Sequence, residues 1–133
     1  MISVSMVLFL LSCFWCLEAG PLGVYFNRVD GTSCIQTEWT ISHGQLFVEE
    51  AIYCYKEKHS AKLAVVKEEG LEAYAIASGS LDEWKRFLDV AHKQCELADH
   101  DDDMGTLFYS SNNRVCTGFQ ARLYELVPGT CER

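Results

Sequence analysis

The stretch SHGQLFVEEAIYCY, residues 42–55, decides how the middle of this chain is interpreted. Ser42 can cap a helix N-terminus, and Gln45 follows three residues later, as a capping box requires. Apolar side chains then recur at helical spacing, at Phe47, Ala51 and Cys54. These features predict a helix over residues 44–58.

Two more helices are predicted after this one. Residues 67–78 carry a second helical pattern, which Gly79 would end. Residues 81–97 carry the strongest periodicity in the chain, and Ser80 with Glu83 forms a capping box at its start. One stripe of this third helix is apolar: Leu81, Trp84, Leu88, Ala91 and Cys95.

Residues that favour β-structure flank the helical region. Residues 23–29 predict an opening strand, and residues 63–66 predict a short buried strand. Three further strands are expected near the C-terminus, at residues 107–109, 115–119 and 122–127. Helices in the middle and strands at both ends predict one α+β domain, with two or three helices packed on a small antiparallel sheet.

Residues 1–20 have the features of a signal peptide. An apolar run too short for a comfortable membrane span is followed by the small residues Ala19 and Gly20. An N-terminal anchor is the alternative, but nothing basic follows the run to stop transfer. We expect cleavage to leave residues 21–133 as one secreted, extracellular domain that is not inserted in a membrane.

The chain is acidic, with a net charge of −8. Glu18 is the one charged residue of residues 1–20, so its removal changes the net charge from −8 to −7. The lysines of residues 56–67 are interleaved with Glu57, Glu68 and Glu69, and the sequence shows no basic patch. We therefore expect no binding to nucleic acid, anionic membranes or other polyanions.

Five cysteines remain after signal cleavage: Cys34, Cys54, Cys95, Cys116 and Cys131. In an oxidising compartment they should pair and leave one thiol, either free or bonded to another chain. Choosing the odd cysteine in five ways and pairing the rest in three ways gives fifteen arrangements, which composition does not separate. A zinc site is not expected, because no Cys-x2-Cys motif or histidine pair survives cleavage.

Several segments resemble C-type-lectin-like domains and the related Link modules. The run FVEEAIYC at residues 47–54, followed by AKLAVV at residues 61–66, is similar to the first helix and next strand of the lectin-like fold. GVYF at residues 23–26 resembles the opening strand of Link modules. The spacing from Cys95 to Cys116 is similar to that of the second and third Link cysteines, and Cys131 lies near the end as in many lectin domains.

The resemblance implies a disulfide pairing and a class of ligand. Cys54 would pair with Cys131, and Cys95 with Cys116. Cys34 would then be unpaired, or would form an interchain bond in a disulfide-linked dimer. Domains of this superfamily recognise proteins and glycans, so the resemblance implies an extracellular protein or glycan as the partner.

The acidic loop at residues 99–103 is a weak candidate for a calcium site. Asp99, Asp101 and Asp103 alternate as the oxygen ligands of an EF-hand loop do. However, Gly105 comes one residue late and Ser110 stands where a bidentate glutamate is needed. A solvated acidic loop is the alternative interpretation. The sugar-binding calcium motifs of C-type lectins are also missing, so no cofactor is expected.

Catalytic constellations are missing from the sequence. There is no Gly-x-Ser-x-Gly motif, and the cysteines are expected to be oxidised. We therefore expect a secreted, non-catalytic recognition protein that lacks the usual calcium-dependent sugar site, with a binding face that the sequence does not identify. The alternative is a structural or matrix-associated protein that assembles through an interchain disulfide at Cys34. A calcium-dependent enzyme ranks below both.

Overall fold

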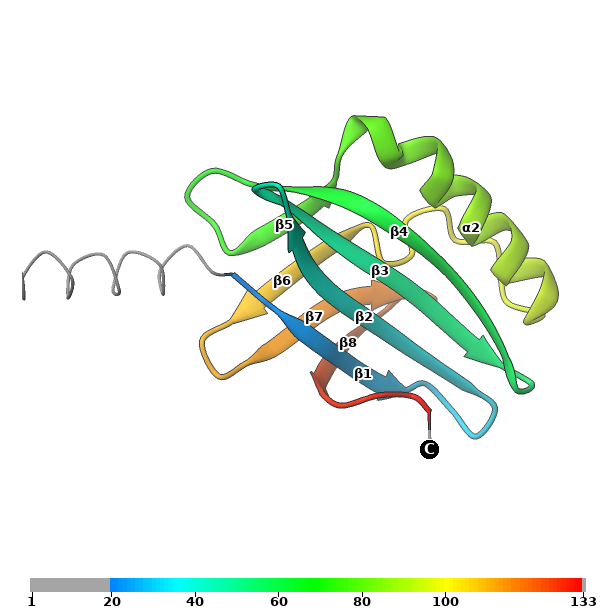
Figure 1. Cartoon of the computed structure of the whole chain (residues 1–133). Helices are drawn as coiled ribbons and strands as arrows, with labels where there is room; N and C mark the ends of the chain where they lie inside the picture. Colours follow the sequence, from blue (N-terminus) through cyan, green and yellow to red (C-terminus); the bar gives the residue numbers. More distant parts are fainter. Residues whose placement is uncertain (1–19, 133) are drawn as a thin grey trace, which may run out of the picture.

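The computed structural model describes residues 20–132 (Figure 1). The predicted signal peptide therefore lies outside the described residues, apart from Gly20. Eight antiparallel strands follow one another around a closed barrel, and the last strand pairs with the first. The elements are β1 (Gly23–Arg28), β2 (Ser33–Ser42), β3 (Gln45–Cys54), β4 (Glu57–Lys67), β5 (Ala73–Ile76), a 3-10 turn η1 (Ser78–Ser80), α2 (Leu81–Gln94), β6 (Thr106–Ser110), β7 (Arg114–Phe119) and β8 (Arg122–Pro128).

The predicted α+β, C-type-lectin-like fold is wrong. The helix expected at residues 44–58 is instead the hairpin of β3 and β4, and the helix expected at residues 67–78 is the end of β4 together with β5. Residues four apart share a face in a helix and also in a strand, so the spacing of Phe47 and Ala51 fits both. The buried alternation of Val48, Glu50 and Ile52 is the strand pattern.

The third predicted helix is confirmed as α2. Its buried side chains lie on one face: Trp84, Phe87, Leu88, Ala91 and His92. This face covers the part of the barrel wall where β4 has no strand beside it, because β5 pairs only with Val65–Lys67 of β4. The helix runs alongside β4 in Figure 1. No helix among residues 20–132 is long and apolar enough to cross a membrane.

Side chains fill the barrel interior. The largest fully buried side chains come from several strands and from the segment before β6, and they include Trp39, Ile52, Leu63, Met104, Leu107 and Phe119. An eight-stranded barrel has an interior just wide enough to be filled by side chains or to hold one small ligand. In this barrel side chains fill the interior, and the clefts lie on the outside.

Two intrachain disulfides hold the barrel. Cys34 of β2 pairs with Cys131 of the C-terminal tail, and Cys54 at the end of β3 pairs with Cys95 after α2. This corrects the pairing implied by the lectin-like resemblance, which joined Cys54 to Cys131 and Cys95 to Cys116. Cys54 ends its strand beside the C-terminus of α2, whereas the tail that carries Cys131 lies against β2, so each cysteine has a different neighbour from the one expected.

Candidate functional site

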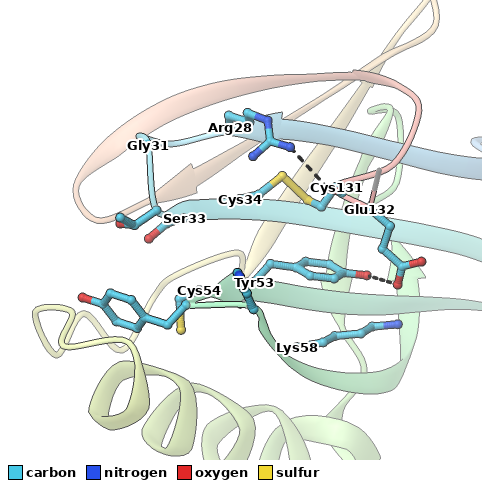
Figure 2. Close-up of a pocket in the computed structure, with 12 residues that line it drawn as sticks. Arg28, Gly31, Ser33, Cys34, Tyr53, Cys54, Lys58, Cys131 and Glu132 are labelled. Atoms are coloured by element: carbon cyan, nitrogen blue, oxygen red, sulfur yellow. Dashed lines mark hydrogen bonds between the residues drawn. A yellow bond between two sulfur atoms is a disulfide. The ribbon is translucent and has the colours of Figure 1, made fainter.

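A cleft of about 950 Å³ opens on the outside of the barrel beside the Cys34–Cys131 disulfide. Figure 2 shows how three separate segments form its walls. The β1–β2 loop and the C-terminal tail bound one side, and the tip of the β3–β4 hairpin bounds the other. The disulfide fixes the tail against β2, and the Cys131 backbone N–H also donates to Gln36 Oε1 at 2.9 Å. The cleft is therefore braced on the side of the tail.

The lining of this cleft is basic and aromatic. Arg28, Lys56 and Lys58 contribute three cations, whereas Glu132 is the one carboxylate among the lining residues. Tyr53 and Tyr55 add two phenol rings. The site therefore has a local positive charge on a chain whose net charge is −8.

The cations of the cleft keep part of their hydrogen-bonding capacity. Arg28 Nη2 donates to the Cys131 carbonyl oxygen at 3.4 Å, which leaves its other N–H groups for a ligand. Lys58 Nζ lies 3.1 Å from Glu49 Oε1 and 5.8 Å from the centre of the Tyr53 ring. Lys56 makes no ion pair with any residue of the described part of the chain.

Local interactions fix the charge states of two side chains in the cleft. The hydrogen bond from Lys58 to Glu49 raises the pKa of the lysine, so Lys58 stays cationic. Partial burial raises the pKa of Tyr53, whose phenol stays neutral and donates to Glu132 at 3.2 Å. The site thus offers ammonium and guanidinium donors together at physiological pH, beside a neutral phenol whose O–H is already donated to Glu132.

Sequence analysis missed this cluster for a geometric reason. The lysines of residues 56–67 seemed to be offset by Glu57, Glu68 and Glu69, but a strand directs successive side chains to opposite faces. Lys58 and Lys62 therefore share the outer face, and Glu57 lies on the other. Arg28 joins Lys58 only because β1 and the β3–β4 hairpin meet at the same end of the barrel.

The three aspartates of the predicted calcium site do not come together around one ion. Asp103 is buried. Its carboxylate accepts hydrogen bonds from the Gln120 backbone N–H at 2.7 Å and from Gln120 Nε2 at 2.8 Å, and it lies 2.8 Å from His92 Nε2. Asp99 is exposed and lies 3.3 Å from His92 Nδ1, and Asp101 is exposed. Protein groups thus satisfy the carboxylate of Asp103, which joins α2 to the β7–β8 turn.

Another group of possible metal ligands is occupied by a disulfide. Sγ of Cys54, Sγ of Cys95 and a ring nitrogen of His59 lie within 4.8 Å of one another. The two sulfurs are bonded to each other, and a metal needs thiolates. The oxidised protein therefore does not present this group as a metal site.

Two predictions concerned the odd cysteine. Cys34 is buried and bonded to Cys131, so it is neither free nor available for an interchain bond. Cys116 on β7 is instead the cysteine without a disulfide partner among residues 20–132. Burial, followed by the charge of Glu125, raises the pKa of its thiol and so reduces the thiolate fraction.

Comparison of the chain with protein-family models, curated proteins and solved structures finds no match in any of the three.

Proposed function

We propose that the protein is a secreted, non-catalytic binding protein that holds an anionic ligand in the cleft beside the Cys34–Cys131 disulfide. One observation carries this proposal: three cations and two tyrosines gather around a braced cleft of about 950 Å³ on an otherwise acidic protein. Positive charge concentrated in a concave site attracts anions even when the net charge of the protein is negative.

The chemistry of the lining favours a ligand with carboxylate or sulfate groups. The guanidinium of Arg28 presents N–H donors in a plane that matches a carboxylate or sulfate, and Lys58 adds a second positive charge. The rings of Tyr53 and Tyr55 add apolar surface with a polar tip, which suits contact with a sugar ring or a side chain. An acidic glycan satisfies all of these requirements.

Secretion is supported by the covalent structure. Two disulfides persist in oxidising compartments such as the secretory pathway and the extracellular space, and are rare in the cytosol. The apolar segment within residues 1–20 supports the same proposal.

A glycan array that includes sulfated, uronate and neutral glycans tests the proposal. We expect binding to sulfated or uronate glycans, which weakens as salt is added and is unchanged by a chelator. The double variant Arg28→Ala/Lys58→Ala should weaken binding about tenfold, because each partly exposed charge contact contributes about 0.7 kcal/mol.

Lys67→Ala is the matched control. Lys67 is also an exposed lysine paired with a glutamate, Glu72 at 3.1 Å, but it does not line the cleft. Its replacement should leave glycan binding unchanged. Equal binding of neutral and acidic glycans, or full binding by the double variant, would exclude the cleft as an anion site.

A further inference from the structure

The first half of β4 has no strand on one side. β3 pairs with β4 over residues 57–64, whereas β5 pairs only with Val65–Lys67. The barrel is therefore closed at one end of β4 by a strand and at the other end by α2. Beside α2, the free edge of β4 extends over residues 58–62.

The hairpin geometry identifies the backbone groups that point to this edge. Cys54 and Glu57 flank a two-residue turn and form a hydrogen-bonded pair, so residues 57, 59 and 61 direct their backbone groups toward β3. The intervening residues direct their backbone N–H and C=O groups away from β3, toward the free edge; these are Lys58, Ser60 and Lys62. Ala64, the next residue in this series, shows the direction: its carbonyl accepts Ala77 N–H at 2.8 Å, and its N–H donates to Ser80 Oγ at 3.0 Å.

The N–H and C=O groups of Lys58, Ser60 and Lys62 have no partner within residues 20–132 on this side. Backbone groups of this kind on an open strand edge are a template for pairing with another strand. Ser60 and both lysines are exposed residues, and Lys58 and Ser60 line an open groove.

A groove of about 480 Å³ runs along this edge. Residues 58–61 form one wall, and Arg86, Phe87 and Val90 of α2 contribute to the other. Ala61 and Phe87 are buried, whereas Val90 is half exposed. The groove therefore has an apolar floor beside a row of unpaired backbone groups, which is the arrangement that strand addition requires.

We propose that this groove binds an extended acidic peptide segment of a partner protein, which adds to the free edge of β4 as a further strand. Side chains of the added strand would alternate between two faces. On the outer face they would lie beside Lys58 and Lys62, and on the inner face beside Ala61 and Phe87. The segment should therefore alternate acidic and small apolar residues over about five positions.

Charge complementarity selects a partner peptide over a second copy of this chain. Lys58 and Lys62 both neighbour Glu49, which pairs with Lys58 at 3.1 Å, and Lys62 Nζ lies 5.2 Å from the centre of the Phe47 ring. Arg86 adds a further cation on the helix wall, opposed by Glu83. Two β4 edges brought together would place these lysines against each other, and like charges across strands are destabilising.

The probe for this site is a capped heptapeptide of alternating glutamate and valine, added to the full secreted protein. At saturating peptide, we expect at least tenfold slower hydrogen exchange at the amides of Lys58, Ser60 and Lys62, resolved by NMR. The amides of residues 57, 59 and 61 already bond to β3 and should not change. An unchanged exchange rate at the three edge amides at millimolar peptide would overturn the proposal.

N-methylated peptides provide the matched control. Methylation of every second amide removes the donors that face β4 in one phase and donors that face away in the other. Only the first phase should abolish binding. Equal effects of the two phases would show that the peptide does not pair as a strand.

Charge variants separate this groove from the anion cleft. Lys62→Glu/Arg86→Glu should weaken peptide binding about tenfold, and Arg28→Ala should leave it unchanged. Lys62 on the free edge and Arg86 on the groove wall are both exposed, so the variant is expected to fold, and near-ultraviolet circular dichroism checks that it does. Loss of peptide binding on Arg28→Ala alone, or concentration-dependent protection of the edge amides without peptide, would overturn the proposal in favour of the cleft or of a second copy.

Discussion

Glu50 is an acidic residue whose side chain is isolated from water. It lies on β3 between Thr37 of β2 and Ala61 of β4, and it is fully buried in the barrel. Neither carboxylate oxygen has a hydrogen-bond partner. The Trp84 indole is close, but its N–H donates to the Asp103 carbonyl at 3.2 Å. Burial, and then the charge of Asp103, raise the pKa of Glu50 well above its ordinary value of 4.5.

This raised pKa predicts that stability falls as the pH rises. The folded state holds the Glu50 proton more tightly than the unfolded chain, so the stabilisation is complete below pH 4.5 and is lost as the pH rises through the folded pKa. In that window the free energy of unfolding should fall by up to about 1.4 kcal/mol per pH unit. Urea unfolding of wild type and Glu50→Gln at several pH values measures this slope, which should be absent in the variant.

Glu69→Gln is the control for this slope, because Glu69 is exposed on the loop between β4 and β5. It should retain the wild-type pH dependence. Asp30 contributes in the opposite direction, because its hydrogen bonds with Thr32 lower its pKa and its stabilisation is lost only as the pH falls below about 3.8. A Glu50→Gln variant that keeps the wild-type slope above pH 4.5 would assign the titration to another group.

Helical spacing in the sequence concealed the burial of Glu50. In the structure Val48, Glu50 and Ile52 lie on the inner face of β3, whereas Phe47, Glu49 and Tyr53 are more exposed. In the predicted helix, Glu50 would have been a solvated charge among Phe47 and Ala51. The assignment of residues 45–54 to a helix or to a strand thus decided whether Glu50 was expected to be solvated or buried.

At the scale of elements, three two-residue hairpin turns set the register of the barrel. Their residue pairs all have positive φ: His43 and Gly44, Tyr55 and Lys56, and Gln120 and Ala121. Type I′ turns of this kind favour asparagine, aspartate or glycine, and only one of these six positions has glycine. The five other residues adopt the left-handed backbone conformation, which costs energy for a residue with a Cβ atom.

Ala121→Gly should therefore stabilise the protein. Ala121 is exposed and has φ 63°, where an alanine Cβ is strained and a glycine is not. After allowing for the larger entropy of unfolded glycine, we expect a gain of about 0.5–1 kcal/mol in the free energy of unfolding. Urea denaturation measures the gain.

Ala77→Gly is the matched control, because Ala77 has φ −63°. Glycine there adds unfolded-state entropy and removes a half-buried methyl group, and the variant should lose about 0.5–1 kcal/mol. If both substitutions destabilised the protein equally, positive φ at residue 121 would not be a source of strain.

The same turns explain which elements the sequence could predict. Helix α2 was predicted correctly because its apolar stripe recurs over four turns, and strands β7 and β8 were predicted because their short runs of β-formers alternate. The hairpin of β3 and β4 was missed because Tyr55 and Lys56 give no sign of a turn. The cleft beside the Cys34–Cys131 disulfide was missed with it, because Arg28 meets Lys58 only when the hairpin exists.

At the scale of the whole molecule, each disulfide fastens a different part to the barrel. The Cys34–Cys131 bond spans 97 residues and holds the C-terminal tail that forms one wall of the cleft. The Cys54–Cys95 bond spans 41 residues and holds the C-terminal end of α2 beside the β3–β4 hairpin. Their removal should therefore have different consequences for function even where the loss of stability is similar.

Both double variants should be less stable than the wild type. In the chain-entropy model, loops of these lengths contribute about 4.7 and about 4 kcal/mol, for Cys34→Ala/Cys131→Ala and Cys54→Ala/Cys95→Ala respectively. The first variant should lose glycan binding in the cleft, and the second should change exchange at the β4 edge, because α2 is no longer fastened there. Cys116→Ser is the control and should alter neither, since Cys116 has no disulfide partner among residues 20–132.

Mass spectrometry of the unreduced protein checks the covalent basis of these effects. Peptides that contain Cys34 and Cys131 should be linked, as should those that contain Cys54 and Cys95. Cys116 should react slowly with a thiol reagent at neutral pH, because its raised pKa leaves little thiolate. Linkage of Cys54 to Cys131 would be incompatible with this barrel, because Cys131 is bonded to Cys34 of β2 and Cys54 is bonded to Cys95 after α2. It would remove the braced cleft together with the anion site proposed in it.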